Sequence, residues 1–263
     1  MTVVRTHHTD HGGTMEIGTI YNEKCWVTTR RMPDGFIDLT VTSPPYDDLR
    51  AYNGYEFRFE PIAKELFRVT KDGGVVVWVV GDATKDGNET GSSFEQALYF
   101  KSVGFNLHDT MIYRKNSSSF PSRPNSNRYT QIFEYMFVFS KGKPKTANLI
   151  IDKPNKWAGF TSFDGKIPPV PELSARENIW TYTTSFNDAT GHPAVFPEQL
   201  ATDHILTWSN EGDLVYDPFM GSGTTAKAAH LSKRQWIGSE ISAEYVDIAN
   251  ERLAPYLTQS ILF

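Results

Sequence analysis

The stretch Asp213-Leu214-Val215-Tyr216-Asp217-Pro218-Phe219-Met220-Gly221-Ser222-Gly223-Thr224 decides how this sequence folds. It opens as an apolar run of strand length, and its glycine loop leads into a helix predicted over residues 224–231. A second strand, predicted over residues 235–239, ends on Glu240. This order is the nucleotide-binding half of a doubly wound α/β fold, in which an acid about 20 residues after the first strand takes ribose hydroxyls.

The glycine loop narrows the class of cofactor. Gly221 and Gly223 let the backbone turn tightly and approach a ligand. The loop lacks the third glycine of a dinucleotide site, and no lysine follows it as in a phosphate-binding P-loop. A nucleoside cofactor without a pyrophosphate therefore fits better than NAD. Glycine loops at strand–helix junctions are common, so this loop alone does not establish function.

Strands and helices alternate along most of the chain that precedes this stretch. Strands are predicted over residues 36–41, 75–80, 107–113 and 132–139, and helices over residues 59–69 and 93–103. Residues 71–74 are predicted to form a turn. The alternation predicts an α/β fold with a doubly wound, mostly parallel sheet.

The alternation stops at Lys141 and resumes at His192. The residues between them, 142–191, contain scattered prolines and aromatics without a sustained period. We interpret them as an irregular insertion between two halves of one α/β domain, residues 15–141 and 192–263. The length of 263 residues also allows two domains.

A second stretch, Thr42-Ser43-Pro44-Pro45-Tyr46, lies at the carboxyl end of the strand predicted over residues 36–41. The two prolines end the strand because neither can donate to a sheet hydrogen bond, and they leave Ser43 little freedom. The loop offers a hydroxyl, backbone carbonyls and an aromatic ring, which together suit a planar group that bears an NH2. When the stretch is taken alone, an ordinary turn that closes a strand is the commoner explanation.

Charge and composition limit the class of protein. The net charge of −5 argues against a protein that coats nucleic acid with its whole surface, yet residues 101–176 hold twelve Lys and Arg against five Asp and Glu. This basic middle is either a phosphate-facing surface or a set of solvated loops. The single cysteine, Cys25, excludes an intrachain disulfide, and no apolar run has membrane-spanning length. We therefore expect a cytoplasmic protein.

Taken together, the two stretches resemble motifs of the DNA amino-methyltransferases. Residues 42–46 are similar to the catalytic motif of that family, and residues 217–225 are similar to its S-adenosylmethionine loop. The order, with the catalytic motif first, resembles the β-class permutation. The likeness covers residues 20–141 and 192–253, whereas the segment between them matches no known pattern, as expected of a target-recognition insertion.

The resemblance implies a permuted Rossmann-like methyltransferase fold, S-adenosylmethionine as cofactor and double-stranded DNA as substrate, with no metal. Catalysis falls to Ser43, Pro44, Pro45 and Tyr46. The Ser43 hydroxyl and the Pro44 carbonyl accept hydrogen bonds from the target amine, and Tyr46 stacks on a base flipped out of the duplex. The implied cofactor-binding residues are Asp217, Phe219, Gly221, Gly223, Thr224, Glu240, His192 and Pro193.

The resemblance leaves several choices open. It allows a homodimer and a cognate restriction endonuclease as partners, and it implies no membrane. Ser43 slightly favours cytosine N4 over adenine N6 as the target, because an acid at this position usually accompanies adenine. The alternative functions are a methyltransferase acting on RNA or a protein side-chain amide, a nucleotide-dependent oxidoreductase on the same fold, and a DNA-binding module without catalysis.

Two further expectations concern lysines. The family usually has an aspartate before the cysteine of its entry strand, whereas this chain has Lys24, whose side chain cannot accept a hydrogen bond from an adenine. In the basic middle, we expect Lys143, Lys145, Lys153 and Lys156 to contribute together to a DNA affinity that weakens as the salt concentration rises.

Overall fold

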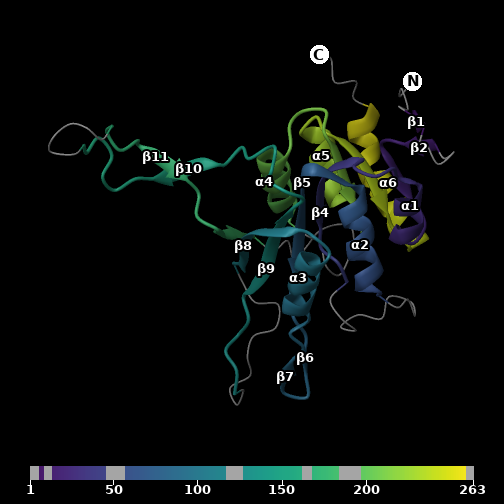
Figure 1. The fold of residues 1–263 in the computed structure, drawn as a ribbon, viewed down its shortest axis with the longest axis horizontal. Coiled ribbons are helices and arrows are strands. Elements are labelled where there is room, and N and C mark those ends of the chain that lie inside the picture. The colour runs from purple at the N-terminus through teal and green to yellow at the C-terminus, as the bar shows by residue number, and fades with distance from the viewer. Residues whose placement is uncertain are drawn as a thin grey trace.

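The computed structural model describes residues 6–8, 14–45, 57–116, 127–161, 168–183 and 197–258. Its centre is an eight-stranded sheet in the order β12-β8-β9-β5-β4-β13-β14-β3 (Figure 1). These strands are β3 (Thr19–Tyr21), β4 (Ile37–Thr42), β5 (Thr70–Val80), β8 (Asn106–Lys115), β9 (Phe133–Ser140), β12 (Ile179–Tyr182), β13 (Leu214–Asp217) and β14 (Gln235–Ser239). Only β9 runs against its neighbours in this sheet. The predicted doubly wound, mostly parallel α/β fold is confirmed.

Two layers of helices cover the sheet (Figure 1). One face carries α1 (Cys25–Arg31), α2 (Phe59–Val69) and α3 (Ser92–Ser102), and the other carries α4 (Glu198–Trp208), α5 (Thr224–Leu231) and α6 (Ala243–Thr258). Successive residues of a strand point to opposite faces, so Val77 joins the core beneath α4 while Trp78 joins the core beneath α2 and α3. Because both faces are covered, the second half of β5 reads as a continuous apolar run.

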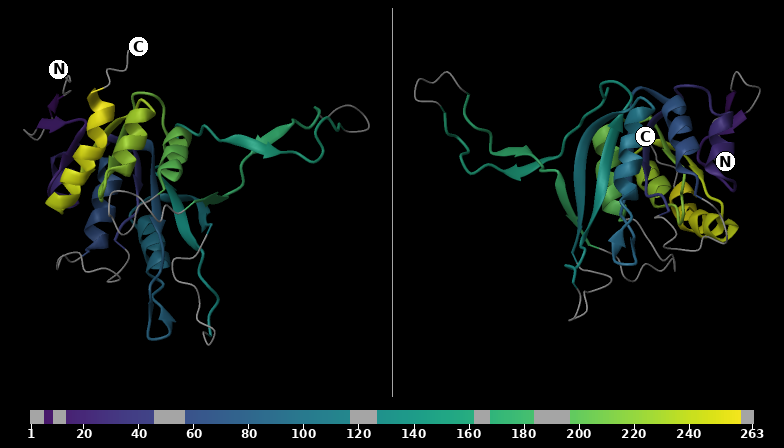
Figure 2. Two further views of the ribbon diagram at one scale, coloured as in Figure 1. Left: turned by 180° about the vertical axis from the view of Figure 1, so that it is seen from behind. Right: turned by 60° about the horizontal axis from the view of Figure 1, so that its bottom comes forward.

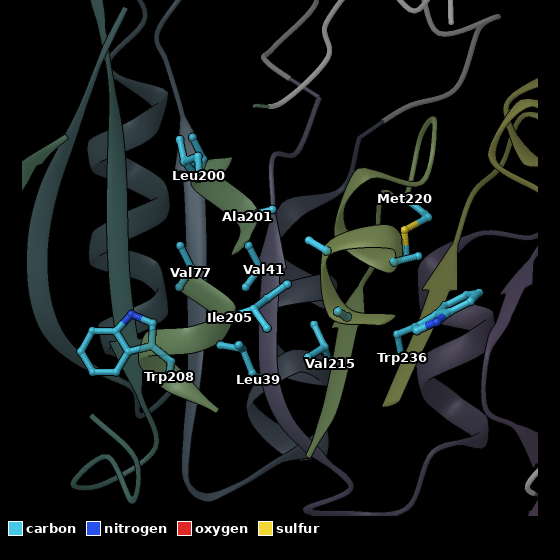
Figure 3. Packing of buried hydrophobic residues seen from close by; sticks show 14 of the residues in the cluster. Leu39, Val41, Val77, Leu200, Ala201, Ile205, Trp208, Val215, Met220 and Trp236 are labelled. Atoms are coloured by element: carbon cyan, nitrogen blue, oxygen red, sulfur yellow. The ribbon is translucent and has the colours of Figure 1, made fainter. Parts of the chain in front are cut away.

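The core beneath α4 packs residues from both halves of the chain against one another. Ile205 of α4 lies over Leu39 and Val41 of β4, and all three side chains are fully buried (Figure 3). Burying each such side chain contributes about 1.5–3 kcal/mol. Since α4 follows the 142–191 segment and β4 precedes it, this packing fixes the second half of the chain on the first.

The turn predicted over residues 71–74 is wrong, because these residues form the beginning of β5. The N–H of Gly73 donates to the Lys141 carbonyl at 2.6 Å, and the N–H of Lys141 donates to the Gly74 carbonyl at 3.1 Å. The pairing register between β4 and β5 is irregular here. A Cβ on Gly74 would lie only 2.9 Å from the Asp38 carbonyl oxygen, so glycine is needed for this close approach.

The described part of the segment predicted to be irregular contains three strands. β12 extends the large sheet at its edge, parallel to β8. β10 (Ile151–Pro154) and β11 (Leu173–Ala175) form an antiparallel ribbon that projects from the body (Figure 2). We name residues 148–178 the arm. All four residues of β10 are exposed, so the ribbon has none of the apolar alternation by which a strand is usually detected.

Two further ribbons lie outside the large sheet. β1 (Thr6–His8) pairs with β2 (Thr14–Glu16), and β6 (Thr84–Lys85) pairs with β7 (Asn88–Glu89) just beyond the carboxyl end of β5. Among the residues that the structure describes, no helix combines the length and the hydropathy that a membrane span requires.

Candidate active site

The two stretches singled out in the sequence meet at the carboxyl ends of β4 and β13. These strands are parallel neighbours, with Val215 opposite Leu39 and Tyr216 opposite Thr40. The chain leaves β4 toward β5 on one side and leaves β13 toward β14 on the other. Doubly wound folds bind their ligands where the strand order diverges in this way. We therefore take the β4–β13 junction as the candidate active site.

Asp217 links the two stretches by direct hydrogen bonds. The Thr42 hydroxyl donates to Asp217 Oδ1 at 2.6 Å, and the backbone N–H of Phe219 donates to the same oxygen at 2.9 Å. Asp217 is 4% exposed. Burial raises the pKa of its carboxyl to about 6, and hydrogen bonds from Thr42, Thr225 and the Phe219 N–H oppose that rise. The carboxyl thus holds the ends of β4 and β13 in one arrangement.

Glu240 holds the glycine loop from the end of β14. Its Oε2 accepts from the Gly221 N–H at 2.8 Å, and its Oε1 accepts from the Ser242 N–H at 2.9 Å. Burial raises the pKa of this carboxyl, while the backbone N–H groups act in the opposite direction. Each carboxylate oxygen can accept more than one hydrogen bond, so Glu240 can shape the loop and still accept from the hydroxyls of a ligand.

The loop passes into α5 through a tight turn at Gly223. This residue has a φ of +82°, in the left-handed region that favours glycine. A Cβ here would also lie 3.0 Å from the Cβ of Ala249 in α6. Thr224 then begins α5. Glycine at this position therefore permits both the turn and the close approach of α6.

Phe219 contributes an aromatic ring at the same end of the sheet. Its ring meets those of Phe57 and Trp78 edge to face, with centroids 5.7 Å and 6.1 Å away. Phe219 is only partly buried, whereas Trp78 of β5 is fully buried. The loop after β13 therefore rests against the core beneath α2 and α3 and offers part of an apolar ring for contact.

Comparison with known proteins identifies the family. Residues 37–251 match the family model of the N6 and N4 DNA methylases. Over 244 residues the chain is 61% identical to the orphan methyltransferase M.BamHII of Bacillus amyloliquefaciens, a match that covers 85% of this chain and 91% of that relative. This chain belongs to the DNA methylase family.

Solved structures share the fold of this DNA methylase. The cytosine-N4-specific PvuII DNA methyltransferase superposes with a TM-score of 0.71 at 23% identity, covering 93% of this chain and 87% of that one. A DNA modification methylase of Thermus thermophilus, TTHA0409, superposes with a TM-score of 0.64 at 24% identity, covering 91% of this chain and 96% of that one. Another structure of TTHA0409 contains S-adenosyl-L-methionine. At these identities the likeness shows the Rossmann-like fold alone.

The family assignment confirms the predicted enzyme class. The protein is a DNA methyltransferase, so its substrate is DNA, and enzymes of this family depend on S-adenosylmethionine. The oxidoreductase alternative is left without support. The choice between cytosine N4 and adenine N6 is not part of this assignment, because the family model covers both positions.

The predicted site residues of the methylase fall into two groups at this junction. Ser43, Pro44 and Pro45 directly follow β4. The second group occupies the ends of β13 and β14 and the beginning of α5, and it consists of Asp217, Phe219, Gly221, Gly223, Thr224 and Glu240. Tyr46, His192 and Pro193 lie outside the described residues.

Sequence reasoning assigned no role to three residues that hold the methylase junction together, although Thr42 and Thr225 lie within the quoted motifs. Thr42 bonds Asp217, Thr225 Oγ1 donates to the Val41 carbonyl at 3.3 Å, and Arg252 contacts the glycine loop. The available signal was a polar residue at a buried position. Thr42 is fully buried at the end of a strand, and a buried hydroxyl requires a partner.

Lys24 lies close to this end of the sheet, at the start of α1. β3 pairs with β14 so that Tyr21 lies opposite Ser239, and the exposed Lys24 follows as the residue that precedes α1. Between them, the side-chain amide of Asn22 donates to the Glu240 carbonyl at 3.0 Å. In this methylase the entry strand is therefore fixed to the end of β14 by an amide.

The lysines of the basic middle lie on two parts of the fold. The N–H of Lys145 donates to the Gly73 carbonyl at 3.0 Å. This bond places residues 141–145 at the amino end of β5, which is the end of the sheet opposite Ser43. Lys153 and Lys156 lie on the arm, where Lys153 forms an ion pair with Glu177. From these positions we now expect Lys153 and Lys156, rather than Lys143 and Lys145, to contact DNA, and this expectation stays a prediction.

Proposed function

We propose that this DNA methylase transfers a methyl group to an exocyclic amine of a base flipped out of duplex DNA, and that the Ser43 loop grips that amine. The observation that carries the proposal is the hydrogen bond of 2.6 Å between Thr42 and Asp217, which are 175 residues apart in the sequence. It fastens a loop suited to an NH2 group directly to a loop suited to a nucleoside.

The residues at the junction fit S-adenosylmethionine. Glu240 offers a carboxylate for the two ribose hydroxyls, and Phe219, two residues before Gly221 in the loop, offers an apolar ring. Gly221 and Gly223 keep side chains out of the approach to the backbone. When bound, S-adenosylmethionine supplies an electrophilic methyl group on a sulfonium sulfur. The proposed site is completed by Asp217, Thr224, His192 and Pro193.

Ser43 and Pro44 act on the target amine. An exocyclic amine is a poor nucleophile because its lone pair is delocalised into the ring. The Ser43 hydroxyl and the Pro44 carbonyl accept its two N–H groups, which favours a tetrahedral nitrogen and localises the lone pair. Pro45 stiffens the loop, so these acceptors are held in place before the base arrives. Tyr46 stacks on the flipped base.

Cytosine N4 is the favoured target, with adenine N6 as the alternative. Ser43 is a neutral acceptor that can also donate, which suits a smaller ring with acceptors next to the amine. The PvuII enzyme, whose fold is similar, is cytosine-N4-specific, and this supports the same choice.

We assign target recognition to residues 142–191, between a catalytic half at residues 15–141 and a cofactor-binding half at residues 192–263. The arm is the projecting part of this insertion, and the major groove of DNA admits a two-stranded ribbon of this kind. Near its tip, the rings of Trp157 and Phe160 are 70% and 64% exposed, with centroids 6.0 Å apart.

The proposal extends to partners and location. The relative at 61% identity is named an orphan methyltransferase, which favours an enzyme that works without a cognate restriction endonuclease. A homodimer stays a prediction. Because the substrate is DNA, we propose a cytoplasmic location.

Ser43→Ala tests the proposal. We expect the transfer of labelled methyl from S-adenosylmethionine to duplex DNA to slow by roughly 10²-fold, as when one preorganised hydrogen-bonding group is removed from an active site. Calorimetry should give an unchanged cofactor Kd.

The matched control is Ser140→Ala, at the opposite end of the sheet. The buried hydroxyl of Ser140 donates to the Gly142 carbonyl at 2.8 Å. This variant should transfer methyl at the wild-type rate. A wild-type rate in Ser43→Ala would remove the hydroxyl from the mechanism.

A further inference from the structure

Helix α6 carries an arginine, Arg252, whose side chain contacts the glycine loop. Arg252 Nη1 donates to Thr224 Oγ1 at 3.0 Å, and it lies 3.3 Å from both the carbonyl oxygen and the Oγ of Ser222. Ser222 and Thr224 flank Gly223, the residue that makes the left-handed turn into α5. The guanidinium therefore spans the turn on which the shape of the loop depends.

The other terminal nitrogen of the same guanidinium, Nη2, forms a hydrogen bond with a residue of α4. Arg252 Nη2 donates to Glu198 Oε2 at 3.3 Å, and Lys227 Nζ of α5 donates to the same oxygen at 2.8 Å. The side chains of Arg252 and Lys227 are only 17% and 14% exposed. A planar guanidinium bonded on both sides cannot turn without losing several of these contacts together.

The electrostatics make a purely helix-stabilising role a poor explanation. The first turn of a helix carries partial positive charge on its N–H groups, so a cation beside Thr224 is unfavourable for α5. The carboxylate of Glu198, in the first turn of α4, offsets this charge. The guanidinium of Arg252 therefore costs α5 some stability, while it makes three contacts with Ser222 and Thr224.

We propose that Arg252 is a positioning residue for the cofactor. By tying Ser222 and Thr224 to Glu198, it holds the turn at Gly223 in the shape that receives S-adenosylmethionine. The inference rests on the proposed function of this loop. Its consequence is that a residue of the C-terminal helix sets cofactor affinity without acting on the reacting groups.

Arg252→Met, which keeps an unbranched apolar chain and removes the guanidinium, tests the inference. We expect the calorimetric Kd and the KM for S-adenosylmethionine to rise roughly tenfold, since charge-assisted hydrogen bonds to the loop are lost. At saturating cofactor, kcat should stay within about twofold of wild type, because the Ser43 loop is unchanged. Arg252→Lys keeps the charge and should restore part of the affinity.

Arg234→Met is the matched control. Arg234 is 9% exposed and bonds Ser209 and Ser232 at the other end of α5. This variant should lower the unfolding midpoint and leave cofactor affinity unchanged. Glu198→Gln keeps Arg252 in place, and it should raise the Kd roughly threefold and combine non-additively with Arg252→Met.

A cofactor Kd at the wild-type value in Arg252→Met, or a loss no larger than in Arg234→Met, overturns this inference and leaves the proposed function standing. If the wild-type protein itself does not bind S-adenosylmethionine, the proposed function fails. Should Arg252→Met not fold, Arg252→Lys and Glu198→Gln decide the question, and wild-type affinity in both overturns the inference.

Discussion

The glycine loop and the arm are built in opposite ways. A buried carboxyl and a half-buried carboxyl hold the backbone of the loop, with Asp217 accepting from the Phe219 N–H and Glu240 from the Gly221 N–H. On the arm, the Lys153–Glu177 ion pair is 45% and 68% exposed, and such pairs contribute little to stability. The loop thus receives its ligand in a shape fixed in advance, whereas the arm offers exposed side chains. Substitutions in the loop should change stability and cofactor affinity together, and substitutions on the arm should change DNA affinity alone.

Glu240→Ala should have the largest effect. Two backbone N–H groups lose their acceptor, which costs about 1–3 kcal/mol each, and the ribose hydroxyls lose theirs. We expect a cofactor Kd roughly 10²-fold higher by calorimetry, with DNA affinity within about twofold of wild type. Glu211→Ala is the control, since Glu211 is exposed and forms a surface pair with Lys233 at 3.4 Å. An unchanged cofactor Kd in Glu240→Ala would contradict the assignment of this loop.

The stability of the Thr42→Val variant as a function of pH tests the hydrogen bond that links the two stretches. The folded pKa of Asp217 is about 6, above its usual 3.8. The carboxyl therefore contributes its full stability below about pH 4, and that contribution is lost as the pH rises through 6. Removal of the Thr42 donor raises the pKa further and extends the loss above pH 6. We expect the variant to be destabilised by roughly 1 kcal/mol more at pH 8 than at pH 5 in urea unfolding.

The control for this experiment is Thr207→Val. The Thr207 hydroxyl is also buried, but it donates to the Asp203 backbone carbonyl at 2.7 Å and not to a carboxyl. Its destabilisation should be the same at both pH values. A pH-independent penalty in Thr42→Val would mean that the hydrogen bond to Asp217 does not bias the ionisation of that carboxyl.

The arm should respond in the opposite manner. Replacing Trp157 and Phe160 together by Ala should weaken duplex binding roughly 30-fold or more, since exposed aromatics that contact bases contribute about 1–3 kcal/mol each. Stability should change by less than about 0.5 kcal/mol, and cofactor affinity should be unchanged. The control is the double variant Lys143→Gln and Lys145→Gln, at the end of the sheet opposite Ser43. This variant should leave the salt dependence of DNA binding unaltered. If replacing the lysine pair weakens DNA binding more than replacing the aromatic pair does, DNA contacts a different surface of the protein.

The sequence predicted the loop far better than the arm, for physical reasons. The helix over residues 224–231 and the strand over residues 235–239 match α5 and β14 residue for residue, because buried elements carry a periodic apolar pattern. β10 and β11 are short, and β10 is exposed along its length while β11 is at most half-buried, so they carry no such pattern. The start of β5 was missed because Gly73 and Gly74 suit a turn as well as a bulged strand. Within the site, the motifs were readable and a polar residue at the end of an apolar strand marked Thr42, but the partners of Thr42 and Arg252 are distant in the sequence and leave no local signal.

Mass spectrometry of nucleosides from DNA methylated by this enzyme shows whether the Ser43 loop acts on an exocyclic amine. If the Ser43 loop grips an exocyclic amine, the product carries its methyl group on that amine, and we predict N4-methylcytosine. N6-methyladenine as the only product would contradict the choice of base and keep the mechanism. A product of 5-methylcytosine would contradict the mechanism itself, because methylation of a ring carbon gains nothing from acceptors placed on the amine.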